Sequence, residues 1–319
     1  MKKVSLLIPC YNEEENIPLL YDAILNLVEN QKQYTWEILI VNDGSNDDTL
    51  ECIKRLQNKD SRICILDLSR RFGKEAALLA GFDHVTGDCT VIVDADLQDP
   101  FEIIPQMLEY WDQGYDDIYA RRKSRGKESW VRKHLSLAFY SLMQKMTDFD
   151  ILPNVGDFRL LDSKCVEELR RLRETERYTK GLYCWIGFKK KEIVFDRDNR
   201  KSGKSRWTYN HLVGLAINGL TSFSTIPLRI STITGFIISI YAFCHLVYFL
   251  LKTLIFGDIV QGFPTLVILI LFLGGVQLLS IGIIGEYVGK IYMESKHRPV
   301  YIVKEYITGD AETSKSHDK

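Results

Sequence analysis

The chain has 319 residues, enough for one large domain with an appendage or for two small domains. Its 41 Lys and Arg residues nearly balance 42 Asp and Glu, and the formal net charge of −1 gives no support to a nucleic-acid-binding protein driven by bulk charge. The seven cysteines are scattered without a CxxC pair, which argues against metal–thiolate and disulfide frameworks and favours a reduced, cytosolic setting.

Short apolar segments in the N-terminal third have the composition of buried strands. Each is followed by a polar loop and then by a helical stretch, which predicts βαβ units in an α/β fold with a mostly parallel, doubly wound sheet and flanking helices. Loops after parallel strands gather on one edge of a sheet, where we expect the functional site. The predicted strands are Val4–Ile8, Glu37–Val41, Cys64–Leu68 and Thr90–Asp94.

The segment Val91–Pro100, VIVDADLQDP, carries the clearest chemical signal. Side chains alternate along an extended chain, so Asp94 and Asp96 leave the strand end on the same side. Two carboxylates that close repel each other unless a cation lies between them or one is protonated. A divalent metal that grips a phosphorylated ligand explains the pair, and a solvated acidic turn is the alternative.

The blocks that follow the predicted strands read IPCYNEEEN, VNDGSNDDT, LSRRFGKEAAL and DADLQDP. In this succession the chain resembles the family-2 inverting glycosyltransferases with the GT-A, Rossmann-like fold. The resemblance implies a nucleotide-sugar site in which Asp94, Asp96 and Gln98 hold Mg²⁺ or Mn²⁺ against the diphosphate, and hard oxygen ligands suit these ions. It also implies nucleotide-sugar contacts by Pro9, Tyr11, Glu13, Val41, Asp43, Lys74 and Ala95.

Structural alternatives exist for three of these residues. Glu13 could serve only as a helix N-terminal carboxylate. Asp43 could be only an Asx-turn former. Lys74 could be either a phosphate contact at a helix start or a solvated surface lysine.

The middle of the chain is basic and amphipathic. Residues 119–127 are densely cationic, and apolar side chains then recur at three- and four-residue spacing from Val131 to Met146. With basic residues on the other faces, this pattern is typical of an interfacial membrane helix, predicted over 132–147. A second amphipathic helix is predicted in the juxtamembrane segment 209–227. Either helix could instead cover the sheet.

Two further blocks, PNVGDFRLLD at 153–162 and SGKSRW at 202–207, resemble those of the polyprenyl-phosphate glycosyltransferases. That branch includes dolichyl-phosphate-mannose synthases and bacterial undecaprenyl-phosphate glucosyltransferases. The resemblance implies that Arg206 reaches the donor diphosphate and that Asp157 lies near the acceptor, as a catalytic base or an orienting group. It assigns the lipid phosphate to Arg122, Arg132 and Ser136.

Two long apolar segments, about 230–251 and 265–288, can each cross a hydrocarbon core of ~30 Å at ~1.5 Å per residue. They predict a two-helix transmembrane hairpin within residues 228–289. Basic residues flank the hairpin, so the positive-inside rule places the catalytic domain (1–208), a tail (290–319) and both termini on the cytoplasmic side of the inner membrane. Small residues along the second segment favour close helix contact and a homo-oligomer.

Together, these features predict transfer of a hexose from a nucleotide-sugar to undecaprenyl or another polyprenyl phosphate, supplying a lipid-linked sugar for modification of cell-surface glycans. UDP-glucose is the favoured donor because the GDFRLLD block resembles the glucosyltransferase branch. UDP-N-acetylglucosamine and GDP-mannose are alternatives. A non-catalytic membrane sensor of nucleotide-sugars, or an accessory subunit of a flippase, is the rival from another class. No nucleic-acid partner is expected.

Overall fold

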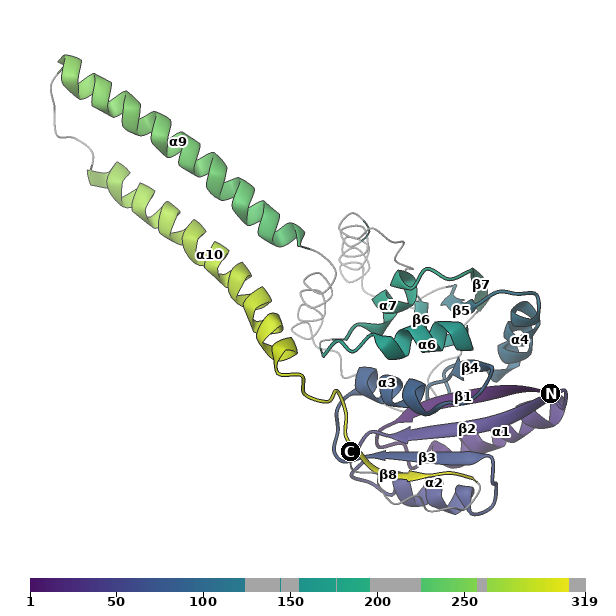
Figure 1. Cartoon of the computed structure of the whole chain (residues 1–319). Helices are drawn as coiled ribbons and strands as arrows, with labels where there is room; N and C mark the ends of the chain where they lie inside the picture. Colours follow the sequence, from purple (N-terminus) through teal and green to yellow (C-terminus); the bar gives the residue numbers. More distant parts are fainter. Residues whose placement is uncertain (124–143, 145–154, 176, 196–224, 257–262, 310–319) are drawn as a thin grey trace. The chain divides into compact units, whose positions relative to one another are not determined.

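The structure is a computed structural model that describes residues 1–123, 144, 155–175, 177–195, 225–256 and 263–309 (Figure 1). The chain divides into two units, Met1–Thr208 with Arg298–Lys319, and Tyr209–His297. The predicted interfacial helix 132–147 lies outside the described residues except for Gln144, and so does nearly all of the predicted juxtamembrane helix 209–227.

The first unit is built on an eight-stranded sheet in the order β7-β5-β6-β4-β1-β2-β3-β8. Its centre is parallel: β1 pairs with β2 and β4, and β2 pairs with β3. Strand β6 runs antiparallel to β4 and β5, and β8 runs antiparallel to β3. The predicted mostly parallel α/β sheet is therefore confirmed. The strands are β1 Lys2–Cys10, β2 Tyr34–Asn42, β3 Ile63–Leu68, β4 Cys89–Ile92, β5 Asp117–Arg122, β6 Val155–Asp162, β7 Lys190–Phe195 and β8 Val303–Ile307.

Helices cover both faces of this sheet (Figure 1). Alternation along β1 sends Leu6 and Ile8 into the core shared with α1, α2 and α4, whereas Leu7 faces α3. A Cβ at Gly81 of α3 would lie 2.1 Å from Leu7 Cδ1, so glycine is what allows this helix to approach the strand closely. The helices are α1 Ile17–Asn30, α2 Thr49–Gln57, α3 Lys74–His84, η1 Phe101–Ile103, α4 Ile104–Asp112, α6 Ser163–Arg171 and α7 Thr179–Trp185.

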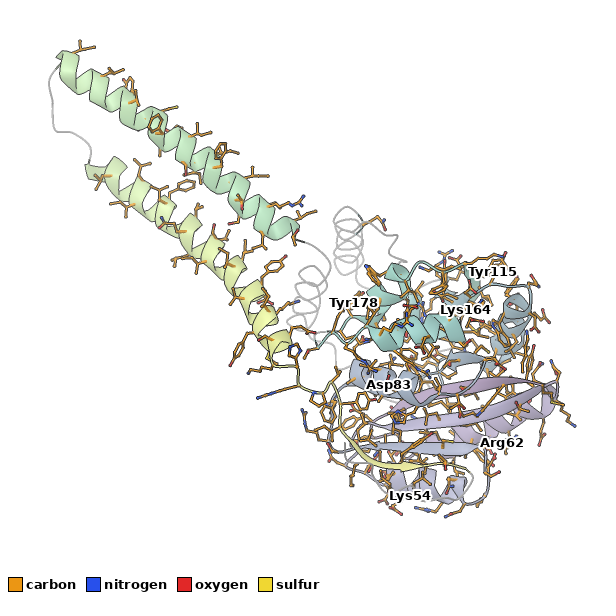
Figure 2. The ribbon with its side chains drawn as sticks, viewed as in Figure 1. Lys54, Arg62, Asp83, Tyr115, Lys164 and Tyr178 are labelled. Atoms are coloured by element: carbon orange, nitrogen blue, oxygen red, sulfur yellow. The ribbon has the colours of Figure 1, made fainter. Side chains whose placement is uncertain are left out.

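The end of the chain returns to the first unit as an edge strand. Residues 290–319 were expected to be a tail, but β8 pairs with β3 and places Tyr306 opposite Leu66. Asp83 and Lys54, both labelled in Figure 2, reinforce this return. The Tyr301 hydroxyl donates to Asp83 Oδ2 at 2.6 Å, and Lys54 Nζ lies 3.1 Å from a carboxylate oxygen of Glu305. A five-residue strand with no apolar run gives almost no sequence signal, so only the pairing reveals it.

The second unit contains two long helices that lie side by side, α9 Ile226–Phe256 and α10 Phe263–Ser295 (Figure 1). Each contains a window that is long and apolar enough to cross a membrane, Leu228–His245 with mean hydropathy 1.3 and Phe272–Ser295 with mean hydropathy 1.4. Neither window is buried within the protein. The predicted apolar hairpin is thus present as a pair of helices.

Candidate functional site

A cavity of about 200 Å³ opens where the central parallel strands end. Its walls come from four successive strand-to-helix loops, because the strand order β4-β1-β2-β3 makes the carboxyl ends of these strands neighbours. Eight of the predicted donor and metal residues meet there, although they are spread over nearly ninety positions of the chain. The lining residues are Pro9, Cys10, Tyr11, Glu13, Asp43, Arg71, Lys74, Ala77, Asp94, Ala95 and Asp96.

Lys74 is the central cation of the cavity. It is the first residue of α3, and its Nζ lies 2.6 Å from Asp94 Oδ1 and 2.7 Å from Asp157 Oδ2. The Lys74 side chain is 42% exposed, whereas that of Asp157 is only 7% exposed. The solvated surface lysine considered from sequence is therefore wrong, because this ammonium joins the end of β4 to β6.

The ion pairs with Lys74 perturb its neighbours. Burial by itself would raise the pKa of Asp157, but the charges of Lys74 and Lys180 and the hydrogen bond from Lys74 lower it to about 2. Burial likewise opposes the charged form of Lys74, yet Asp94 and Asp157 raise the pKa of its ammonium well above the usual value. Lys74 and Asp157 are therefore both charged at neutral pH.

The loop after β4 is compact and strained. The Asp94 backbone N–H donates to Asp99 Oδ2 at 3.1 Å, and the Gln98 N–H donates to Asp96 Oδ1 at 3.2 Å. Leu97 adopts a left-handed conformation with φ 56°, which costs on the order of 1–3 kcal/mol. A strained residue persists only where the surrounding structure holds it in place, and such residues cluster at functional sites.

Asp99 is a buried acid that the sequence analysis did not single out. Burial and the charge of Asp94 raise its pKa to about 7, against partial compensation by the charges of Lys74 and Arg122. The sequence signal was available, since Asp99 belongs to the same DADLQDP block. The Asp99 carboxyl accepts the hydrogen bond from the Asp94 N–H and so fixes the backbone there.

Asp43 connects two loops of the cavity. Its carboxylate accepts hydrogen bonds from the backbone N–H groups of Phe72, at 2.7 Å, and Gly73, at 2.9 Å. These partners lie in the loop before α3, so Asp43 is not simply the Asx-turn former considered from sequence. Burial raises its pKa despite these bonds. Gly44 completes the junction, with φ 62° and the Arg70 carbonyl carbon 2.4 Å from where a Cβ would lie.

An aromatic and cationic wall closes another side of the cavity. The Arg71 guanidinium lies over the Tyr11 ring, 4.2 Å from its centroid, and Asn46 Nδ2 donates to the Tyr11 hydroxyl at 3.3 Å. Arg71 is a lining residue that the sequence analysis did not select. The RR pair in SRRFGK was its only sequence signal, and a basic pair alone cannot say which arginine turns inward.

Glu13 lies just before α1 and also faces the cavity. Its carboxylate accepts from Asn16 Nδ2 at 2.6 Å. Burial raises the pKa of Glu13, as do the charges of Asp96 and Asp94, while the Asn16 bond opposes the shift. Val41, by contrast, is a fully buried residue of β2 and is absent from the cavity lining.

Of the residues predicted to bind the lipid phosphate, the structure describes only Arg122. Arg122 is the last residue of β5 and is half-buried. Arg132, Ser136 and Arg206 lie outside the described residues, so their predicted roles stay predictions.

The donor atoms at Asp94, Asp96 and Gln98 suit a metal shared with a ligand. Among the described residues, no group of three or more His, Cys, Asp or Glu side chains is arranged to hold a metal ion. Mg²⁺ is usually bound through only one or two carboxylates together with substrate phosphates and water. Gln98 Oε1 is buried and accepts no hydrogen bond from the part of the chain that the structure describes. The loop therefore offers oxygen ligands that fit such an ion.

Comparison with known proteins places this cavity in a family. The profile described as glycosyl transferase family 2 matches residues 5–170, which include the loops after β1 to β4 and Asp157. The chain belongs to glycosyl transferase family 2. The likeness to this family seen in the sequence is confirmed, and the protein is a glycosyltransferase.

Relatives match this glycosyltransferase along nearly its whole length. An uncharacterized glycosyltransferase of Synechocystis sp. is 43% identical over 303 residues, 95% of each chain. The bactoprenol glucosyl transferase of Shigella phage SfV is 42% identical over 302 residues, 95% of this chain and 98% of the relative. Among solved structures, glucosyl-3-phosphoglycerate synthase from Mycobacterium tuberculosis, with Mn²⁺ and UDP, is similar with a TM-score of 0.45 and 17% identity, over 69% of this chain and 78% of that one.

Proposed function

We propose that this glycosyltransferase transfers glucose from UDP-glucose to a polyprenyl phosphate, such as undecaprenyl phosphate, at the cytoplasmic face of the membrane. The observation that carries the proposal is the full-length similarity to the phage protein named bactoprenol glucosyl transferase, 42% identical over 95% of this chain. The two apolar helices give it independent support, because an enzyme that acts on a lipid needs to work at a membrane surface.

In this proposal, Asp94, Asp96 and Gln98 hold Mg²⁺ or Mn²⁺ beside the donor. When bound, such an ion neutralises the charge that builds up on the departing nucleoside diphosphate. Asp43 and Tyr11 form walls against which the nucleotide binds, since both line the cavity. Arg206 assists at the diphosphate, and inversion follows from a single in-line displacement.

The acceptor needs little deprotonation, because a phosphate monoester is ionised at neutral pH. A strong base is therefore not required at Asp157, and its surroundings do not make it one. Asp157 is buried, its Oδ2 is engaged by Lys74, and its lowered pKa makes it a weak base. We assign Asp157 to orientation of Lys74 and of the acceptor. Arg122, Arg132 and Ser136 bind the lipid phosphate in this scheme.

The test uses the purified full-length chain in detergent with undecaprenyl phosphate and Mg²⁺. Labelled UDP-glucose, UDP-N-acetylglucosamine and GDP-mannose are supplied separately, and label is counted in the organic phase. We expect label from UDP-glucose, dependent on added lipid phosphate and lost in Asp96→Asn, a variant that changes one ligand atom and little volume. Binding of UDP without transfer from any donor would instead support a nucleotide-sugar sensor or an accessory subunit.

A further inference from the structure

Lys74 bridges two carboxylates with different surroundings. Asp94 lies in the loop after β4, and 34% of its side chain is exposed, whereas Asp157 comes from β6 and is buried. Both contacts are short, 2.6 and 2.7 Å, so the single ammonium serves both at once. Asp94 is also the first of the proposed metal ligands. One cation therefore already occupies an oxygen that a metal would require.

The backbone before Lys74 is anchored by hydrogen bonds, whereas its side chain is partly exposed. Gly73, with φ 100°, and Phe72 are held by the carboxylate of Asp43, which sets where α3 begins. From this anchor the Lys74 side chain reaches the cavity with 42% of its surface exposed, so its flexible stem has room to move. Asp157 is buried and cannot follow it. Any change of partner at this site is thus made by the lysine.

Acceptor capacity at the site is only partly used. Asp157 Oδ1 and Gln98 Oε1 are both buried, and neither has a hydrogen-bond partner within the described ranges. Buried polar atoms are nearly always hydrogen-bonded, so these two oxygens can accept a bond or coordinate a cation. Asp157 joins the acidic loop through Lys74, which also contacts Asp94, and Gln98 belongs to that loop.

We infer that Lys74 is the resting counterion of the donor site: its ammonium competes with a divalent metal for Asp94 in the donor-free enzyme and pairs with the donor's diphosphate once both are bound. The inference rests on the proposed metal-dependent function and adds a role for Lys74 to it. It follows from charge. A divalent ion on Asp94 repels an adjacent ammonium, whereas a diphosphate attracts both cations.

This role predicts that removing the Lys74 charge changes two affinities in opposite directions: Mn²⁺ alone binds more tightly and UDP binds more weakly. A lysine that only binds phosphate would not produce the tighter binding of Mn²⁺. Lys74→Met keeps an unbranched, flexible side chain one atom shorter and removes the charge, so Mn²⁺ alone should bind at least ~3-fold more tightly because its competitor is gone. In the same variant, UDP in saturating Mn²⁺ should bind on the order of 10-fold more weakly because a cation has been lost from the diphosphate. Lys74→Arg keeps the charge and should leave the affinity for Mn²⁺ alone close to that of the wild type.

The experiment uses the full chain in detergent. Binding of Mn²⁺ is read from the loss of the electron paramagnetic resonance signal of the free ion, and UDP binding is read by titration calorimetry. Lys164→Met is the matched control, because Lys164 is 71% exposed and lies 3.8 Å from Asp116, outside the cavity lining. Neither affinity should change in this control. Should Lys74→Met fail to fold, Lys74→Gln provides the same comparison with hydrogen-bond donors retained.

Unchanged or weaker binding of Mn²⁺ alone by the neutral Lys74 variant would overturn the inference. Mn²⁺ binding that survives Asp96→Asn unchanged would place the ion elsewhere and overturn it too. Turnover is measured in parallel to separate the two proposals. If the wild type transfers glucose normally but the two affinities of the neutral Lys74 variant do not change in opposite directions, only the role of Lys74 is refuted. If the two affinities change in opposite directions but no lipid-linked product forms, the proposed reaction is refuted and the role of Lys74 stands.

Discussion

The strand that carries Asp157 is held by a buried ion pair whose removal should be costly. Arg159 Nη1 lies 3.1 Å from Asp117 Oδ2, and the two side chains are 2% and 0% exposed. The Arg159 guanidinium also lies over the Tyr183 ring, 3.7 Å from its centroid. Burial raises the pKa of Asp117 even though Arg159 opposes the shift. The pair therefore fixes β6 against β5 at the expense of two desolvated charges.

Breaking one side of this pair leaves the other charge buried without its partner. We expect Asp117→Asn to lower the free energy of unfolding by about 3–5 kcal/mol, since arginine cannot lose its proton. Arg159→Met should cost a similar amount, part of it from lost packing on Tyr183. The double variant removes both charges, so its cost should fall below the sum of the single costs by about 2 kcal/mol or more.

Urea unfolding of the full chain in detergent, followed by tryptophan fluorescence, measures these differences because Trp36 and Trp111 are buried in the first unit. Glu168→Gln is the control: it breaks an exposed pair with Arg171 at 2.9 Å and should change stability by about 0.5 kcal/mol or less. Additive costs, or a loss below about 1 kcal/mol in Asp117→Asn, would refute the reasoning that desolvated charge dominates here.

Other predictions concern pH, the return strand and the loop junction. Arg62 lowers the pKa of Asp60 below its ordinary value of 3.8, so the Asp60 carboxylate stabilises the fold above about pH 4 and this stability is lost as pH falls below that value. Asp60→Asn should therefore lower the melting temperature at pH 7 and lower it by less near pH 3; an equal loss at both pH values would contradict this. Tyr301→Phe removes the hydroxyl that donates to Asp83 and should lower the free energy of unfolding by about 1 kcal/mol. UDP affinity is a second readout, because the Ser69 N–H near the donor loop donates to the carbonyl of Ile302, the residue after Tyr301. Gly44→Ala should weaken UDP binding at least ~10-fold, since the new Cβ would overlap the Arg70 backbone at a left-handed φ; unchanged affinity would show that this loop can move without loss.

The proposed cytoplasmic position of the catalytic unit is open to a direct check. A cysteine introduced in the connection 257–262 should react with an impermeant thiol reagent added outside intact cells, and one introduced in 310–319 should react only after permeabilisation. The opposite pattern would reverse the topology inferred from the flanking basic residues.

Much of this protein could be predicted from its sequence because the relevant signals are local. Strand and helix succession follows from short periodic patterns, and the apolar helices of the second unit follow from length and composition. Asp94 and Asp96 line one cavity as expected, but β4 ends at Ile92, so both lie in the loop after the strand and not on the predicted strand Thr90–Asp94. The gathering of the loops after β1 to β4 follows from a rule that all parallel sheets obey.

Tertiary structure alone decided which side chains share a contact. Lys74 and Asp157 are distant in sequence, and they meet because β6 inserts next to β4 in antiparallel orientation, an order that no local pattern specifies. The same holds for Asp43 with the loop before α3, and for β8 beside β3. Local patterns determine which element forms, because they reflect backbone geometry and burial. Strand order and register depend on the packing of the whole sheet, and these determine which charges neutralise one another in the site.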